Sequence, residues 1–198
     1  ARAIDSLNQW QFQVLEAAAS LNEPFLEKSV VTLTEKEAKS ALEHLVTIGL
    51  VYPSEDGLRL PTQLRDVIGT EPAGLGPASL AKLKLSELDD APVDAKKVLE
   101  RLVWGPPRGS VGDIKNPGPG VTWLLDKKFL VPLDQRTVIL PREVAISLRG
   151  GKIHKERFIK QPELKGARRD ERQINLAAIA NVSTVLRRVV ELLNLWAD

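Results

Sequence analysis

The sequence contains no cysteine and only two histidines among its 198 residues, which excludes several kinds of chemistry. Without cysteine there is no disulfide bond, no thiolate nucleophile and no cysteine-ligated metal. His44 and His154 lie far apart in the sequence, so little remains from which to build a zinc centre. We therefore expect no metal site and no bound cofactor.

Long apolar runs and catalytic motifs are missing as well. No segment approaches the roughly 18 consecutive apolar residues that cross a bilayer, and the first ten residues contain no signal-peptide apolar region. Ser40 and His44 fall one helical turn apart, but no G-x-S-x-G elbow surrounds the serine. The segment GDIKNPGPG has no following Lys-Ser/Thr pair, so it is interpreted as a loop and not as a phosphate-binding motif. We expect no enzymatic activity and no membrane partner.

The charge is distributed unevenly along the chain, although the net charge is only +2. Residues 1–90 contain 8 Lys/Arg against 14 Asp/Glu, a balance of −6, whereas residues 91–198 contain 20 against 12, a balance of +8. A basic half indicates an anionic partner. The alternative is that these are solvated surface charges with no partner.

The first part of the chain has the order of elements that is typical of a winged helix-turn-helix. Apolar residues at three- and four-residue spacing predict one helix over 10–21 and a second over 34–49, where Thr34 and Glu37 have capping-box spacing. Two short apolar runs in LVYPSEDGLRLP, separated by turn-forming residues, predict a hairpin or wing. A short amphipathic segment, TQLRDVIG, follows.

The same order returns about eighty residues later. HLVTIGLVYP aligns with WLLDKKFLVP, VLEAAASL aligns with VLERLVWG, and Leu60-Pro61 aligns with Leu140-Pro141. The predicted fold class is mainly α with small β wings (α+β), as tandem winged helix-turn-helix domains plus a C-terminal helix. The expected boundaries are a first domain at 1–72, a linker at 73–90, a second domain at 91–150, a basic linker at 151–172 that is extended or poorly ordered, and an amphipathic helix at 173–198.

Several segments resemble the N-terminal region of bacterial helicase-associated proteins with an XPB-type N-terminal-like domain. The resemblance spans residues 10–198 and is most specific in WGPPRGSV, FLVPLD, VILPREVAISLRGG and ELLNLW. It implies that this sequence is the leading part of a longer protein that accompanies a nucleic-acid motor. The dense Pro/Gly content of residues 112–121 departs from the linker expected of that family.

Basic residues distinguish the second predicted domain from the first. In the first, the exposed face of the second helix is net acidic, with Glu35, Glu37 and Glu43 outnumbering its lysines. In the second, basic residues fall at the positions where phosphate contacts are expected. These positions lie before and within the helical region, at the end of the recognition helix that enters the major groove, at the wing tip, and along the following helix. The predicted nucleic-acid-binding residues are Arg108, Lys115, Lys127, Lys128, Arg136, Arg142, Arg149 and Lys152.

Two hypotheses follow. The first is a helicase-associated module that binds DNA, duplex or single-stranded, non-specifically through its second winged helix, in a cytoplasmic, nucleoid-associated protein with a helicase or another protein as partner. The alternative is a protein-interaction or homodimerisation scaffold. In that case the apolar stripe of the terminal helix, with Val189, Leu193 and Trp196, binds the partner because such a stripe must pack on something.

Overall fold

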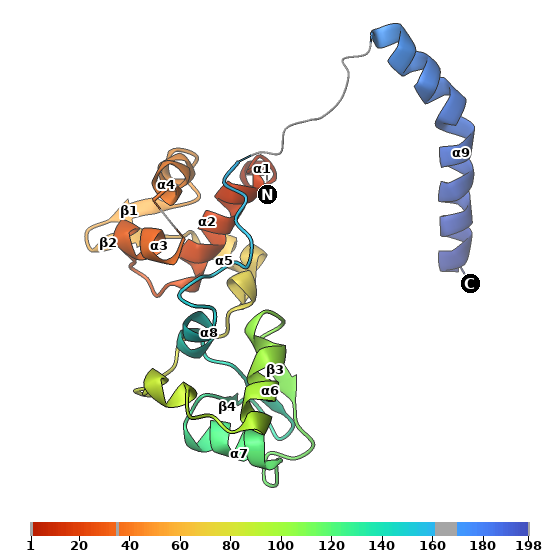
Figure 1. Cartoon of the computed structure of the whole chain (residues 1–198). Helices are drawn as coiled ribbons and strands as arrows, with labels where there is room; N and C mark the ends of the chain where they lie inside the picture. The colour runs from red at the N-terminus through yellow and green to blue at the C-terminus, as the bar shows by residue number, and fades with distance from the viewer. Residues whose placement is uncertain (1, 35, 161–169, 198) are drawn as a thin grey trace. The chain divides into compact units, whose positions relative to one another are not determined.

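The computed structural model describes residues 2–34, 36–160 and 170–197, and divides the chain into two compact units, Ala1–Lys160 and Gln161–Asp198. The first unit combines helices with two small antiparallel sheets of two and three strands (Figure 1). The second contains one long helix. The chain is therefore mainly helical with a minor β component, as the sequence predicts. Within the described residues, no helix is both long and apolar enough to cross a membrane.

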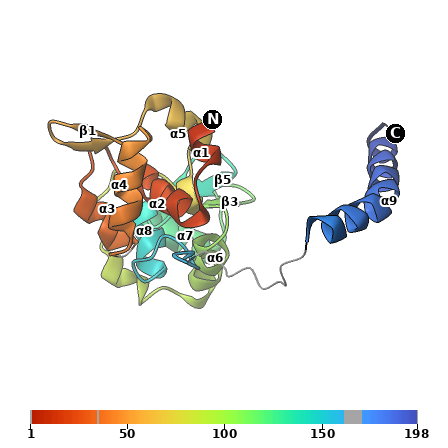
Figure 2. The same ribbon diagram turned by 90° about the horizontal axis from the view of Figure 1, so that it is seen from above.

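The N-terminal half of the first unit is a group of helices with one hairpin. Its elements are α1 (Arg2–Asp5), α2 (Gln9–Ser20), α3 (Glu27–Leu33), α4 (Ala38–Thr47), β1 (Tyr52–Ser54), β2 (Gly57–Arg59) and α5 (Thr62–Ile68). The helix α2 packs against α4, as Figure 2 shows from above. Phe25 forms an isolated antiparallel bridge with Leu58 of β2, which adds an extended segment beside the hairpin.

Two features of this half differ from the sequence prediction. The helix α3 was not predicted, and the next helix begins at Ala38 instead of Thr34. The predicted capping box at Thr34 is wrong, because the Thr34 hydroxyl donates to the Val30 carbonyl at the end of α3. A capping box does exist at α2, where Asn8 and Gln11 exchange side-chain and backbone hydrogen bonds. Glu35 lies outside the described residues.

The C-terminal half of the same unit repeats the helix and hairpin order with a shorter helical part. Its elements are the 3₁₀ turns η1 (Pro72–Gly74) and η2 (Leu85–Leu88), then α6 (Val93–Val103), β3 (Arg108–Ser110), α7 (Pro119–Asp126), β4 (Val131–Pro132), β5 (Thr137–Ile139) and α8 (Arg142–Leu148). The strand order in the sheet is β3-β5-β4. GDIKNPGPG forms a loop, and α7 begins only at its last proline and glycine.

Hydrogen bonds show how closely the two halves repeat each other. At the end of α4, the carbonyl of Leu45 accepts from the amides of Leu50 and Val51 at 2.9 and 3.2 Å. At the end of α7, the carbonyl of Leu124 accepts from Phe129 and Leu130 at 2.8 and 3.1 Å. The bridge of Phe25 with Leu58 likewise has its counterpart in the pairing of β3 with β5. The element that does not repeat is α3, whose place is taken by the loop at 111–118.

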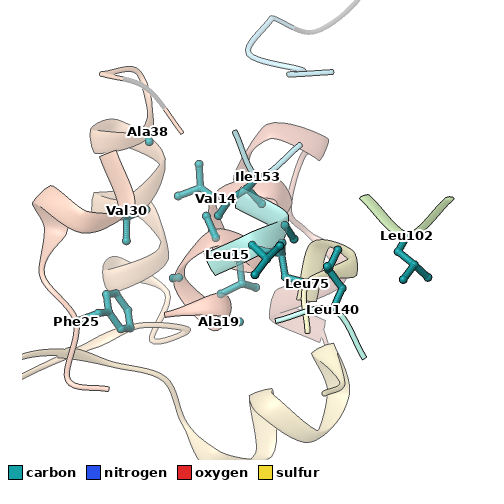
Figure 3. Close-up of a cluster of buried hydrophobic side chains, with 14 of the residues drawn as sticks. Val14, Leu15, Ala19, Phe25, Val30, Ala38, Leu75, Leu102, Leu140 and Ile153 are labelled. Carbon is teal, nitrogen blue, oxygen red and sulfur yellow. The ribbon is translucent and has the colours of Figure 1, made fainter. Parts of the chain in front are cut away.

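The segment between η1 and η2 is packed into the unit. Leu75 is fully buried, and a Cβ on Gly76 would lie 2.2 Å from the carbonyl oxygen of Leu140, so only glycine fits there. The Arg142 amide donates to the Pro77 carbonyl at 3.0 Å. One hydrophobic cluster therefore includes residues of both halves; Figure 3 shows Leu75 and Leu140 together with Leu15 of α2.

Residues 152–158, called the strap from here on, lie against α2. The Gln13 side chain donates to the Glu156 carbonyl at 2.8 Å and accepts from the Phe158 amide at 3.0 Å. The His154 ring pairs with the Glu16 carboxylate at 2.9 Å, and Ile153 is buried. The strap contains no helix or strand, so of the expected extended or poorly ordered segment it fits the extended alternative, and it is bonded to α2. Residues 161–169 of the predicted basic linker lie outside the described residues.

The second unit contains α9 (Glu171–Ala197), a helix of 27 residues that begins two positions before the predicted start. Val189, Leu193 and Trp196 are all exposed along it.

Candidate nucleic-acid interface

The eight predicted phosphate-binding residues fall into three groups in the structure. Arg142 and Arg149 are bonded within the unit and their side chains are largely buried. Arg108 and Lys127 are exposed but ion-paired. The third group is exposed, and no acid among the described residues lies within ion-pair distance of its members, which are Lys115, Lys128, Arg136 and Lys152.

Arg149 is a structural residue. It is 5% exposed, and its guanidinium donates to four backbone carbonyls: those of Val103 at 2.6 Å, Ala73 at 3.1 Å, Gly74 at 3.0 Å and Ile153 at 2.7 Å. The same group stacks over Trp104 at 4.7 Å from the ring centroid. Burial lowers the pKa of Arg149 below its ordinary value. Its prediction as a phosphate contact is wrong, because its donors are already used on the end of α6, on η1 and on the strap.

Arg142, at the start of α8, is also bonded inside the unit. Its guanidinium donates to the Ser20 carbonyl at the end of α2 and contacts Glu143 at 3.3 Å. Only 12% of its side chain is exposed. Arg142 therefore holds α8 to α2, and its prediction as part of the phosphate-binding stripe is corrected.

Arg108 and Lys127 are each neutralised by a glutamate that precedes the second predicted domain. Arg108 on β3 pairs with Glu71, and Lys127 after α7 pairs with Glu87 of η2 at 2.5 Å. The Lys127 hydrogen bond, together with charge from Lys84, lowers the pKa of Glu87. A phosphate would have to compete with these carboxylates, so both residues are weaker candidates than the sequence indicated.

The structure places Lys115 and Arg136 on adjacent loops. The Val111 amide donates to the Arg136 carbonyl at 2.7 Å, and the Ile114 amide donates to the Gln135 carbonyl at 3.0 Å. The loop at 111–118 therefore lies against the β4–β5 turn, immediately before the N-terminus of α7. Lys115 was expected within a helix but lies in this loop instead.

Acidic residues in the same two loops are bonded to the backbone. The Asp113 carboxylate accepts from the Lys115 amide at 2.9 Å. The Asp134 carboxylate accepts from the amides of Arg136 and Thr137, both at 2.7 Å, and these bonds lower the pKa of Asp134. They fix the shape of the loops and leave the two cationic side chains exposed.

Lys128 follows the other end of α7 and has a left-handed backbone conformation, with φ of 61°. Non-glycine residues avoid this region because Cβ crowds the backbone. Its side chain lines an apolar groove of about 610 Å³ between residues 77–81 and 130–133. A lysine thus occupies a position where the backbone favours glycine.

Lys152, at the start of the strap, is exposed, but it comes from a different part of the unit than the loops around α7.

Among the described residues, no group of three or more His, Asp or Glu side chains could hold a metal ion. Sequence reasoning missed β3 and the contact of loop 111–118 with the β4–β5 turn, since neither has a local signature.

Comparison with protein-family models, curated proteins and solved structures found no match for this chain.

Proposed function

We propose that this protein is a non-catalytic DNA-binding module made of two successive winged-helix units, the second of which contacts DNA. The first half supplies a helix, an extended segment that pairs with the second hairpin strand, two helices and a hairpin, which is the order of that fold. The second half supplies the same order without a counterpart of α3. The strand order β3-β5-β4 agrees with this interpretation. The resemblance to helicase-associated proteins is consistent with a role inside a larger protein that acts on nucleic acid.

The single observation that carries the proposal is the adjacency of Lys115 and Arg136. The two cations lie on loops joined by the Ile114–Gln135 hydrogen bond, at the N-terminal end of the proposed recognition helix α7. Cations on a wing and beside the start of a helix are suited to phosphates on the edge of a groove. The dipole of α7 adds a positive potential at the same place.

Fluorescence anisotropy with labelled duplex and single-stranded DNA tests this proposal at low and near-physiological salt. We expect salt-dependent binding of micromolar strength, which is typical of non-specific contacts. The double variant Lys115→Ala with Arg136→Ala should weaken binding to both duplex and single-stranded DNA. The negative slope of log K against log salt should become shallower by up to about 1.8, since each phosphate contact contributes about 0.9.

A matched control separates the site from overall charge. Lys36 is exposed in the first half, so Lys36→Ala with Lys28→Ala removes the same charge elsewhere. If this variant lowers affinity and slope as much as the Lys115 and Arg136 variant, the assignment of the site is refuted. Absence of binding by the unmodified protein at low salt would refute the function itself.

A second candidate function is protein interaction through α9. The observation that favours it is the exposure of apolar residues along the helix, including Trp196 at 78% and Ile179 at 72%. Patches of this kind mark interaction surfaces.

A further inference from the structure

Six of the exposed apolar side chains of α9 follow a regular heptad spacing. Ile179, Val182, Leu186, Val189, Leu193 and Trp196 are separated by three, four, three, four and three positions. A spacing that averages 3.5 residues is typical of a helix that pairs with another helix.

The rest of α9 agrees with helix pairing. Arg187, Arg188 and Glu191 all fall outside the heptad seam, on the opposite face. Val185, Val190 and Leu192 flank the seam, are each about half exposed, and widen the apolar face that a partner would cover. No charged residue interrupts the seam from Ile179 to Trp196, a distance of roughly 25 Å at 1.5 Å per residue. A partner helix of the same length would cover it.

The sizes of the seam residues favour a second copy of this helix, running in the opposite direction. In an antiparallel pair centred between Leu186 and Val189, each leucine faces a valine: Leu186 faces Val189, and Leu193 faces Val182. Ile179 then faces Trp196. Large side chains thus meet smaller ones in every layer, as close packing requires. A parallel pair would instead place Trp196 against Trp196, and it would have leucine and isoleucine at one seam position with valine at the other, the reverse of the arrangement that favours parallel dimers.

From this pattern we infer that α9 is a self-association element, which pairs antiparallel with α9 of a second copy of the chain. The inference names the partner for the protein-interaction role of α9 and is independent of DNA binding by the first unit. It makes the protein a dimer that carries two copies of the unit Ala1–Lys160.

Sedimentation equilibrium on the full chain tests the association. The unmodified protein should have twice the monomer mass at micromolar concentration. Leu186→Glu places a charge in the centre of the seam and keeps high helix propensity, so it should weaken association at least tenfold. Arg188→Glu, on the opposite face, is the matched control and should remain dimeric. A monomer at all concentrations, or a Leu186→Glu variant as dimeric as the unmodified protein, would overturn the inference.

Cross-linking tests the direction, and the absence of native cysteine makes it straightforward. Val182→Cys and Leu193→Cys face each other only in the antiparallel pair, so a mixture of the two should form a mixed disulfide under mild oxidation. Each variant alone should not, because its two cysteines would lie roughly 16 Å apart along the seam, beyond the reach of a disulfide. Equally efficient disulfides in each variant alone would show a parallel pair and overturn the antiparallel arrangement.

Discussion

Gly49 and Lys128 occupy the same position in the two halves of the first unit. Gly49 has φ of 74° after α4, and Lys128 has φ of 61° after α7. The Gly49 amide donates to the Val46 carbonyl at 3.1 Å, and the Lys128 amide donates to the Leu125 carbonyl at 3.0 Å. Both residues turn the chain from a helix into a hairpin, but only the second carries a side chain there.

Lys128→Gly should therefore stabilise the protein by about 1 kcal/mol, because glycine adopts the left-handed region without the Cβ conflict. Gly49→Ala should destabilise the protein by a similar amount, because it places a Cβ in the same left-handed backbone conformation, although open space surrounds Gly49. Urea unfolding of both variants measures the two changes. If Lys128 also contacts DNA, the glycine variant should bind more weakly while being more stable. Equal or lower stability of Lys128→Gly would contradict the assigned backbone strain.

Arg149→Met should lower the free energy of unfolding by at least about 3 kcal/mol. The substitution removes the donors for four carbonyls around a buried site, and each unsatisfied group costs about 1–3 kcal/mol. Arg101→Met, at an exposed position on α6, is the control and should change stability little. Chemical denaturation measures both. A stable Arg149→Met variant with weakened DNA binding would restore the rejected role in phosphate contact.

Gly120→Ala should destabilise the packing of α7 on α6 by about 1–3 kcal/mol. A Cβ at Gly120 would lie 2.6 Å from the carbonyl carbon of Asp94 and 2.7 Å from the amide nitrogen of Ala95, and neither backbone atom can rotate away. Gly112, in the loop before α7, has open space around it, so Gly112→Ala is the matched comparison. Thermal unfolding of the two variants should show a clear loss only for Gly120→Ala; equal melting temperatures would contradict the close approach of the helices.

The ion pair of Glu23 with Arg65 should make stability depend on pH in the acid range. Burial alone would raise the pKa of Glu23, but the Leu60 amide and the Arg65 guanidinium at 2.7 Å hold that pKa below its ordinary value. A carboxyl with a lowered folded pKa stabilises above its unfolded pKa of about 4.3, and this contribution disappears as pH falls through the folded value.

Glu23→Gln should consequently cost stability at pH 7, and the difference from the unmodified protein should shrink between pH 5 and pH 3 of a denaturant series. Glu27 pairs with Lys39 at 3.7 Å, and both side chains are exposed. Glu27→Gln should therefore change stability little at any pH. A Glu23→Gln deficit that stays constant down to pH 3 would show that ionisation of Glu23 is not its source.

Local sequence signals were sufficient for the elements that depend on neighbouring residues. The helices α2 and α4, the two hairpins and the repeat follow from apolar periodicity and turn chemistry, which act within a few residues. α3 escaped detection because it is short and its N-cap, Leu26, makes no side-chain hydrogen bond. Its packing through the buried Val30 is a tertiary effect.

Only the tertiary structure decided which of the predicted cations are exposed for contact with phosphate. Arg149 and Lys152 lie three positions apart, yet one guanidinium is buried on four carbonyls and the other side chain is exposed. Lys127 and Lys128 are adjacent, but only Lys127 meets a glutamate from forty positions earlier. The sequence determined the repeat, the charge distribution and the α9 heptads because these depend on the order of residues along the chain. Which charges remain exposed depends on contacts between distant segments, and that information exists only in the folded protein.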